Sequence, residues 1–200
     1  MSKVKICGLS REEDVEAVNR VLPDFIGFVF APSRRRVDIR TAVLLREKLD
    51  MRIGTVGVFV NEDIDAVTEI YQNGIIDLAQ LHGDEDDEYI KRLKANCGCS
   101  VIKVVGIGDV LPSLPVGPDY LLFDALSEQR GGMGRSFDWN VLEEYCGLPF
   151  FLSGGLSAAN VAASIHMLNP FCVDVSSGVE TDGIKDADKI KKFVDTVRGI

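Results

Sequence analysis

Two side chains suited to proton transfer stand where apolar segments of the chain end. They are Cys7 and Asp124. Burial after a run of apolar residues is expected to raise the pKa of the Asp124 carboxyl toward the range of a general acid. Cys7 can act as a base if a cation favours its thiolate, and Lys5 or an arginine of the segment 34–36 could supply that cation.

Each of these residues also has a purely structural alternative. Cys7 could be a small buried side chain of a strand, and Asp124 could cap a helix or a loop. His82 would ordinarily be the first choice for proton transfer near neutral pH, and nothing in the sequence excludes it. Which of these residues reacts therefore depends on how the fold brings them together.

Three glycine-containing turns predict a binding site for phosphate. They are Gly131-Gly132-Met133-Gly134, Ser153-Gly154-Gly155 and Ser176-Ser177-Gly178. A single glycine turn usually serves only chain geometry, but bare backbone N–H groups in the last two loops of a barrel commonly bind phosphate. The candidate phosphate-binding residues are Gly132, Gly134, Gly154, Gly155, Ser176, Ser177 and Gly178.

A strand-then-helix alternation is expected to position these residues. The predicted strands are 3–8, 25–30, 53–60, 78–83, 101–107, 120–125, 150–155 and 172–178. The predicted helices are 11–21, 39–49, 63–73, 84–95, 140–145, 158–167 and 187–197. The segment 109–118 contains three prolines, so it is at best a helical turn. Ser10 and Glu13 predict a capping box at the start of the first helix.

Eight mostly apolar strands separated by helices predict an α/β fold with a parallel sheet covered by helices. Eight such units close into a single (β/α)8 TIM barrel over residues 1–200, of minimal size and with a short or irregular fifth helix. A doubly wound open sheet is the alternative. It would normally carry a glycine-rich dinucleotide turn after the first strand, and residues 7–10, with the sequence Cys-Gly-Leu-Ser, are not one.

Alternation along the strands places several polar side chains on shared faces. The pairs that share a face are Lys5 with Cys7, Gln80 with His82, and Asp174 with Ser176. The residues between the members of each pair are apolar and are expected to face the helices. The polar side chains should therefore meet at the mouth formed by the carboxyl ends of the strands.

Composition limits the class of protein. The 200 residues carry a formal net charge of −9 and no basic run longer than Arg34-Arg35-Arg36, which argues against a nucleic-acid partner. The sequence shows neither a signal segment nor a long apolar stretch, so we expect a cytoplasmic protein with no membrane partner. The five cysteines are expected to be reduced thiols, and two histidines without a CxxC pair argue against a metal site. A monomer is expected, with a homodimer as the alternative.

Motifs in a fixed order cover nearly the whole chain. They are Lys5-Ile6-Cys7-Gly8, Gly27-Phe28-Val29-Phe30, Ser33-x-Arg35-x-Val37, Val56-Gly57-Val58-Phe59-Val60-Asn61, Gln80-Leu81-His82-Gly83, Gly131-Gly132-x-Gly134, Phe137-Asp138-Trp139, Ser153-Gly154-Gly155-Leu156 and Asp174-Val175-Ser176-Ser177-Gly178-Val179-Glu180. Together with the strand that ends near Asp124, these motifs resemble the phosphoribosylanthranilate isomerase family of tryptophan biosynthesis. Arg135 is a departure from the family, which often has lysine at that position.

The resemblance implies an Amadori rearrangement of N-(5-phosphoribosyl)anthranilate, an aminoaldose, to 1-(2-carboxyphenylamino)-1-deoxyribulose 5-phosphate, an aminoketose. By similarity, Asp124 is the general acid that protonates the ribose ring oxygen and opens the ring to a Schiff base. Cys7 is the base that removes the C2 proton. No cofactor or metal is implied, because the iminium formed from the substrate nitrogen serves as the electron sink.

The resemblance also implies how the substrate is bound. Arg35 matches the family's loop arginine and would contact the anthranilate moiety, with Arg36 as the alternative because three arginines stand in a row. His82 and Asp174, at the ends of their strands, are the further candidate substrate-binding residues. The expected partner is thus a small phosphorylated molecule.

Other functions compete with this one. An indole-glycerol-phosphate synthase-like barrel would need catalytic lysines and a glutamate at its strand ends. An isomerase of dual specificity, which also accepts an aminoaldose of histidine synthesis, usually has two aspartates, so Cys7 disfavours it. A catalytically silent barrel that binds a phosphorylated ligand is disfavoured by the presence of both Cys7 and Asp124.

Overall fold

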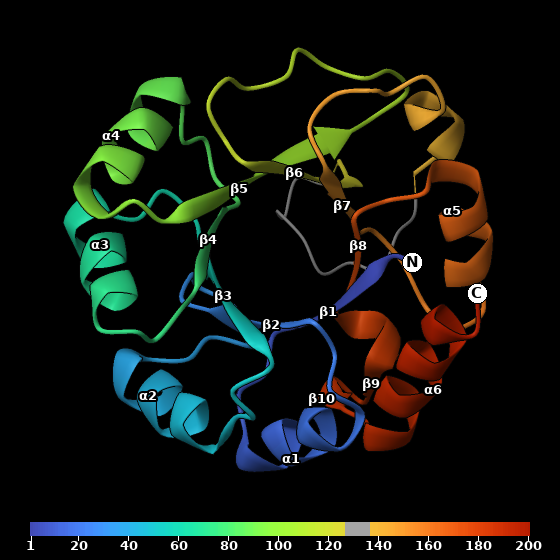
Figure 1. The fold of residues 1–200 in the computed structure, drawn as a ribbon, viewed down its shortest axis with the longest axis horizontal. Coiled ribbons are helices and arrows are strands. Elements are labelled where there is room, and N and C mark those ends of the chain that lie inside the picture. The colour runs from blue at the N-terminus through green and yellow to red at the C-terminus, as the bar shows by residue number, and fades with distance from the viewer. Residues whose placement is uncertain (127–136) are drawn as a thin grey trace.

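Eight parallel strands close into a barrel in the computed structural model, which describes residues 1–126 and 137–200 (Figure 1). The strands are β1 (Lys3–Cys7), β2 (Phe25–Val29), β3 (Gly54–Phe59), β4 (Leu78–Leu81), β5 (Ser100–Ile107), β6 (Tyr120–Ala125), β7 (Phe150–Leu152) and β8 (Cys172–Val175). Each strand pairs with the next, and β8 pairs with β1, where Asp174 lies opposite Lys5. The predicted TIM barrel is confirmed.

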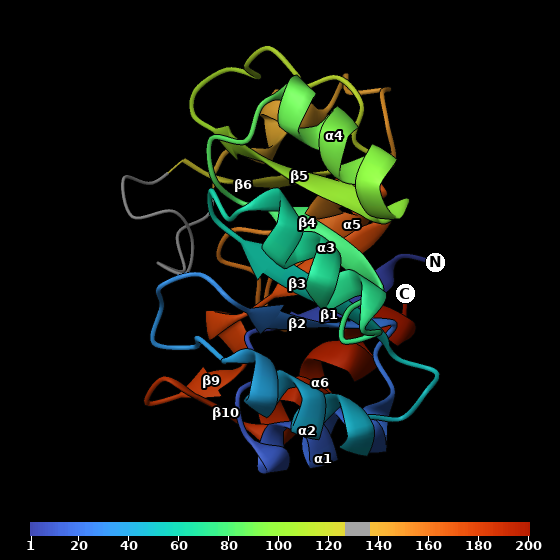
Figure 2. The same ribbon diagram turned by 90° about the vertical axis from the view of Figure 1, so that its left-hand side faces the viewer.

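A ring of helices surrounds the barrel (Figure 1). The α-helices are α1 (Glu12–Val21), α2 (Ile39–Lys48), α3 (Ile64–Gln72), α4 (Asp87–Cys97), α5 (Val161–Leu168) and α6 (Ala187–Arg198). Two short 3-10 helices, η1 (Trp139–Leu142) and η2 (Ser177–Val179), and a hairpin of β9 (Glu180–Thr181) and β10 (Ile184–Lys185) complete the described elements. The hairpin and the N-terminus lie at opposite ends of the barrel (Figure 2), so the hairpin belongs to the end where the strands finish.

A loop without a helix connects β5 to β6. Its three prolines, Pro112, Pro115 and Pro118, lack the backbone N–H that an α-helix needs. This agrees with the prediction of a short or irregular fifth helix. The next predicted helix, 140–145, is also shorter than expected, because only the 3-10 helix η1 forms there.

The predicted capping box at the first helix is wrong. Helix α1 begins at Glu12, and the buried carboxylate of Asp14 accepts hydrogen bonds from the backbone N–H groups of Ser10 (3.0 Å) and Arg11 (3.1 Å). Glu13 is exposed, and the acceptor for these groups is Asp14 instead. The turn after β1 is thus fixed by Asp14, one residue later than the sequence pattern suggested.

An apolar layer fills the barrel interior on the side where the strands begin. It consists of Val56, Ile102, Leu122, Phe151 and Cys172, none more than 1% exposed. Alternate residues of the strands face outward and pack with the helices in a larger cluster. Because burial of apolar area stabilises a fold by about 25 cal/mol per Å2, this layer forms a stable floor under the polar residues at the other end of the strands.

Candidate active site

A buried polar layer lies on the apolar floor and crosses the barrel. The Nζ atom of Lys5 on β1 donates hydrogen bonds to Gln80 Oε1 on β4 (2.9 Å) and to Asp174 Oδ2 on β8 (2.8 Å). Burial alone would lower the pKa of Lys5, but the adjacent Asp174 carboxylate raises it above its ordinary value, so Lys5 is charged. The side chains that strand alternation assigned to the inward face therefore do meet inside the barrel.

Cys7 stands at the end of β1, next to this layer. Burial raises the pKa of the Cys7 thiol above its ordinary value, and the opposing effects of the Lys5 and Lys185 ammonium groups do not reverse this. A nearby cation is present, as the sequence suggested, but Asp174 already neutralises Lys5. Cys7 is therefore a neutral thiol in most molecules of the free protein near pH 7. Gly27 on β2 makes room for it, since a Cβ atom there would lie 2.8 Å from the sulfur.

Asp124 stands at the end of β6, inside the same mouth. Burial is the main cause that raises the pKa of its carboxyl group to about 6, and the nearby Asp174 carboxylate adds to the rise. The hydrogen bond from the backbone N–H of Ala125 to Asp124 Oδ1 (2.8 Å) works in the opposite direction. A carboxyl group that titrates near pH 6 can both give and take a proton near neutral pH.

His82, at the end of β4, faces Asp124. Its Nε2 atom lies 4.0 Å from Asp124 Oδ2, and its Nδ1 atom lies 3.4 Å from Gln80 Nε2. Lys5 has only donors, so it fixes the Gln80 oxygen toward itself and the Gln80 amide nitrogen toward His82. The Nδ1 atom then accepts from Gln80, and the ring proton of a neutral His82 is on Nε2, toward the acid.

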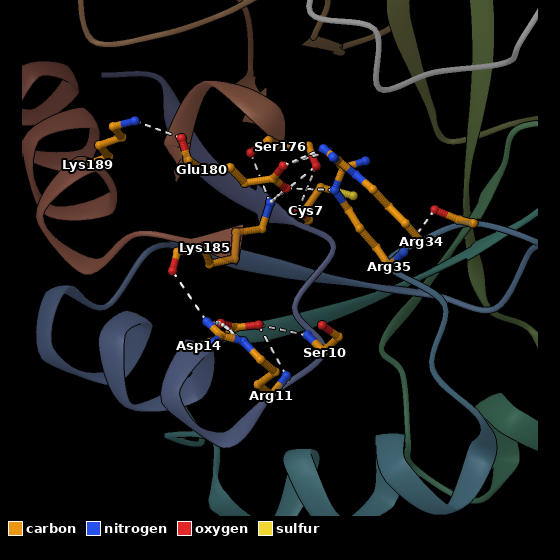
Figure 3. A network of polar contacts seen from close by, with 11 residues as sticks. Cys7, Ser10, Arg11, Asp14, Arg34, Arg35, Ser176, Glu180, Lys185 and Lys189 are labelled. Atoms are coloured by element: carbon orange, nitrogen blue, oxygen red, sulfur yellow. Dashed lines mark hydrogen bonds and ion pairs between the residues drawn. The ribbon is translucent and has the colours of Figure 1, made fainter. Parts of the chain in front are cut away.

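The arginines of the loop after β2 differ in where they point. The stem of Arg35 lies over Gly8, the residue after Cys7, because a Cβ atom on Gly8 would come within 2.5 Å of Arg35 Cδ. Its guanidinium donates to both carboxylate oxygens of Glu180, Nε to Oε1 at 2.7 Å and Nη2 to Oε2 at 2.9 Å (Figure 3). Arg36 is exposed. Of the two arginines that the sequence left open, Arg35 is the one at the mouth.

Two of the three glycine turns lie side by side in the described residues. Gly154 and Gly155 have φ angles of 85° and 64°, and no described hydrogen bond engages their backbone N–H groups. A Cβ atom on Gly178 would lie 1.9 Å from Leu156 O, so the turns after β7 and β8 touch there. The predicted strands 150–155 and 172–178 are too long, because left-handed glycines end β7 and a 3-10 turn follows β8.

Ser176 connects the turn after β8 to Cys7. Its hydroxyl donates to the backbone oxygen of Cys7 at 3.0 Å, and Lys185 Nζ donates to the backbone oxygen of Ser176 at 2.9 Å. Ser177 begins η2 in the same turn. The candidates Gly132 and Gly134, and Arg135 beside them, lie outside the described residues.

Lys103 and Glu85 form a buried ion pair that the sequence did not predict. Lys103 donates to Gly83 O (2.7 Å) and to Glu85 Oε2 (2.8 Å), while Glu85 accepts from the backbone N–H groups of Asn61 (2.6 Å) and Gly83 (2.8 Å). This contact set joins the loops after β3 and β4 to the middle of β5, where Lys103 lies on the outward face with Val101 and Val105. Hydrophobic periodicity gives no signal for it. A buried lysine in an otherwise apolar strand, such as Lys103, is the one feature that could have pointed to it.

Over residues 1–126 and 137–200, no group of three or more histidine, cysteine or acidic side chains could hold a metal ion. Within the same ranges, none of the helices combines the length and the apolar character needed to cross a membrane. All five cysteines are free thiols.

Comparison with known proteins places the whole chain among one set of relatives. It matches the family model of N-(5'phosphoribosyl)anthranilate (PRA) isomerase over residues 4–196. It is 49% identical to the N-(5'-phosphoribosyl)anthranilate isomerase of Endomicrobium trichonymphae, with 100% of both chains covered. It is 48% identical to that of Clostridium acetobutylicum, with 99% of this chain and 98% of the relative covered.

Solved structures give the same result. The chain superposes on phosphoribosyl anthranilate isomerase from Thermotoga maritima with a TM-score of 0.87 and 33% identity over 100% of both chains. It also superposes, with a TM-score of 0.84 and 31% identity over 100% of both chains, on a phosphoribosyl anthranilate isomerase in complex with reduced 1-(o-carboxyphenylamino)-1-deoxyribulose 5-phosphate.

Proposed function

The chain belongs to the N-(5'-phosphoribosyl)anthranilate isomerase family, and on this basis we propose that Cys7 is its catalytic base and Asp124 its catalytic acid. It is an aldose–ketose isomerase of tryptophan biosynthesis. It converts N-(5-phosphoribosyl)anthranilate into 1-(2-carboxyphenylamino)-1-deoxyribulose 5-phosphate. This identity favours the Amadori reaction over the synthase-like and catalytically silent barrels that the residues alone left open.

Asp124 carries the first step. A carboxyl group with a pKa of about 6 is protonated in about a tenth of the molecules at pH 7. Protonated Asp124 donates its proton to the ribose ring oxygen, the ring C–O bond breaks, and the substrate nitrogen forms an iminium with C1. His82, with its Nε2 atom 4.0 Å from the carboxylate, is proposed to contact the ribose beside this acid.

Cys7 carries the second step. The iminium makes the C2 proton acidic, the Cys7 thiolate removes it, and the resulting enolamine tautomerises to the ketone. Burial raises the pKa of Cys7, so only a small fraction of the molecules holds the thiolate. A desolvated thiolate is a stronger base than a solvated one. The Lys5 and Lys185 ammonium groups offset part of the free-energy cost of forming the thiolate. The observation that carries this assignment is the pair of buried groups at one mouth, an acid with a pKa of about 6 and a base with a raised pKa.

The remaining polar groups bind the substrate. The bare N–H groups of Gly154 and Gly155, together with the Ser176-Ser177-Gly178 turn, hold the phosphate, and Gly132 and Gly134 are proposed to complete this site. Arg35 binds the anthranilate carboxylate. Asp174 and His82 face the ribose. The support for this arrangement is the packing of the two turns against each other and of Arg35 against Gly8.

The protein is further proposed to be a cytoplasmic enzyme with one domain over residues 1–200, in agreement with its free cysteines. A monomer is the proposed state. A homodimer is the alternative, since one of the similar solved structures describes monomers derived from a dimeric Thermotoga maritima isomerase.

Loss of anthranilate fluorescence with freshly generated phosphoribosylanthranilate tests the proposal. Cys7→Ala and Asp124→Asn should each reduce turnover by about 10^2- to 10^4-fold while leaving the far-ultraviolet circular dichroism spectrum unchanged. Cys146→Ala and Asp109→Asn, both at exposed positions, are the matched controls and should react at the wild-type rate. Wild-type turnover in either site variant would remove that residue from the mechanism.

A further inference from the structure

Glu180 lies at the centre of a cluster of charged side chains beside the mouth. Its side chain is 4% exposed and contacts three cations: Arg35, Arg34 and Lys185 (Figure 3). Arg34 Nη2 lies 2.7 Å and Lys185 Nζ 2.8 Å from the carboxylate, in addition to the two hydrogen bonds from Arg35. Burial alone would raise the pKa of Glu180, but the hydrogen bonds from Arg35 and Lys185 lower it, so the group is charged.

The two arginines on this carboxylate have different surroundings. Arg34 is 56% exposed and lies by Gly183, where a Cβ atom would come within 2.7 Å of Arg34 Nη1. Arg35 is 11% exposed and lies over Gly8, directly after Cys7. Glu180 thus holds one arginine on the outside of the β9–β10 hairpin and the other at the mouth.

The geometry of the Arg35 contact leaves one edge of its guanidinium available. Nε and Nη2 are engaged by Glu180, and no hydrogen bond from the described part of the chain reaches Nη1. A guanidinium held in this way presents a donor in a fixed direction, while an unrestrained arginine must first lose rotamer freedom to do so.

Hydrogen bonds connect the cluster to Ser176, directly after β8, and through it to Cys7 on β1. Lys185 pairs with Glu180 across the β9–β10 hairpin and also donates to Ser176 O (2.9 Å). Ser176 in turn donates to the backbone oxygen of Cys7. The position of Glu180 is therefore fixed relative to the base, and the position of Arg35 follows from it.

We propose that Glu180 is a positioning residue, which orients Arg35 so that the free edge of its guanidinium receives the carboxylate of the substrate's benzoate ring. The proposal rests on the proposed role of Arg35. It makes Glu180 a determinant of specificity for an aminoaldose with an ortho-carboxylate, without direct contact to the substrate.

The test uses two ligands that differ by one group. Reduced 1-(o-carboxyphenylamino)-1-deoxyribulose 5-phosphate and its analogue made from aniline, which lacks the carboxylate, are titrated into the protein by calorimetry. Wild type should prefer the carboxylated ligand by about ten- to hundredfold, as expected for a charge-assisted hydrogen bond. Glu180→Gln should weaken binding of the carboxylated ligand about tenfold, because the new amide NH2 cannot accept from Arg35. Binding of the aniline-derived ligand should weaken less than about twofold.

Two further variants complete the design. Glu180→Asp keeps the charge and should restore part of the preference, and Arg34→Gln removes a cation from the same carboxylate and should leave the preference unchanged. If Glu180→Gln weakens the binding of both ligands equally, the role of Glu180 is merely structural and the proposal is overturned. Tighter binding of the carboxylated ligand would also overturn it, because Glu180 would then compete with the substrate for Arg35. If wild type shows no preference at all, the proposed role of Arg35 itself is wrong.

Discussion

The pH dependence of kcat/KM should reflect two groups, Asp124 and Cys7, that each react in their minor form near neutral pH. Asp124 must be protonated and titrates at about 6, whereas Cys7 must be ionised and titrates above its ordinary value of 9.0. The form with both groups in the required state is then at most about one molecule in a thousand. Between these two pKa values, each gain in thiolate is cancelled by an equal loss of protonated Asp124. The wild-type rate should therefore be flat from about pH 6.5 to 8.5.

Asp124→Asn removes this cancellation. With water in place of the acid, only the Cys7 thiolate titrates, so the residual rate should rise about tenfold per pH unit over the same range. The variant also controls for the substrate, since a phosphate group titrates near pH 6 and affects both enzymes alike. The assay is the fluorescence decrease at substrate concentrations well below KM. A wild-type rate that rises or falls tenfold per pH unit across this range would refute the reasoning, because one of the two groups would then not take part.

Two further substitutions test the frame of the site. Lys5→Met should lower the free energy of unfolding by about 3–5 kcal/mol in urea titrations, because it leaves the buried Asp174 carboxylate without its ion-pair partner. A loss of less than about 1 kcal/mol would contradict this account of the polar layer. Gly178→Ala should cost about 1–3 kcal/mol and raise KM more than it lowers kcat, because its Cβ would meet the backbone oxygen of Leu156 and push the two turns apart. An unchanged KM in a folded Gly178→Ala protein would mean that these turns do not hold the phosphate.

The sequence predicts most of the scaffold because local signals decide it. Apolar runs of strand length, the regular alternation with helices and the polar residues at strand ends predict the barrel and the convergence of Lys5 with Asp174. The proline-rich segment 109–118 likewise predicts the loss of a helix. The strands, the helices and the lost helix depend on neighbours within a few residues, and alternation along each strand assigns Lys5 and Asp174 to the inward face.

The contacts that tune the site depend on the closed barrel and are not visible in the sequence. Arg35 and Glu180 are separated by 145 positions, and the packing of the Arg35 stem over Gly8 distinguishes this arginine from its two neighbours. The charge state of Cys7 depends on burial, which outweighs the effect of nearby cations. The sequence shows Lys5 two residues before Cys7, but it does not show that Asp174 neutralises this lysine.

Trapping of the open-chain intermediate tests the central claim most directly, because it separates the step assigned to Asp124 from the step assigned to Cys7. Cyanoborohydride reduces the iminium, and mass spectrometry counts the reduced product. Cys7→Ala should still open the ring and accumulate trapped iminium, whereas Asp124→Asn should trap no more than an enzyme-free control. If Asp124→Asn traps as much iminium as Cys7→Ala, or if Cys7→Ala traps none, the assignment of acid and base to these two residues is contradicted.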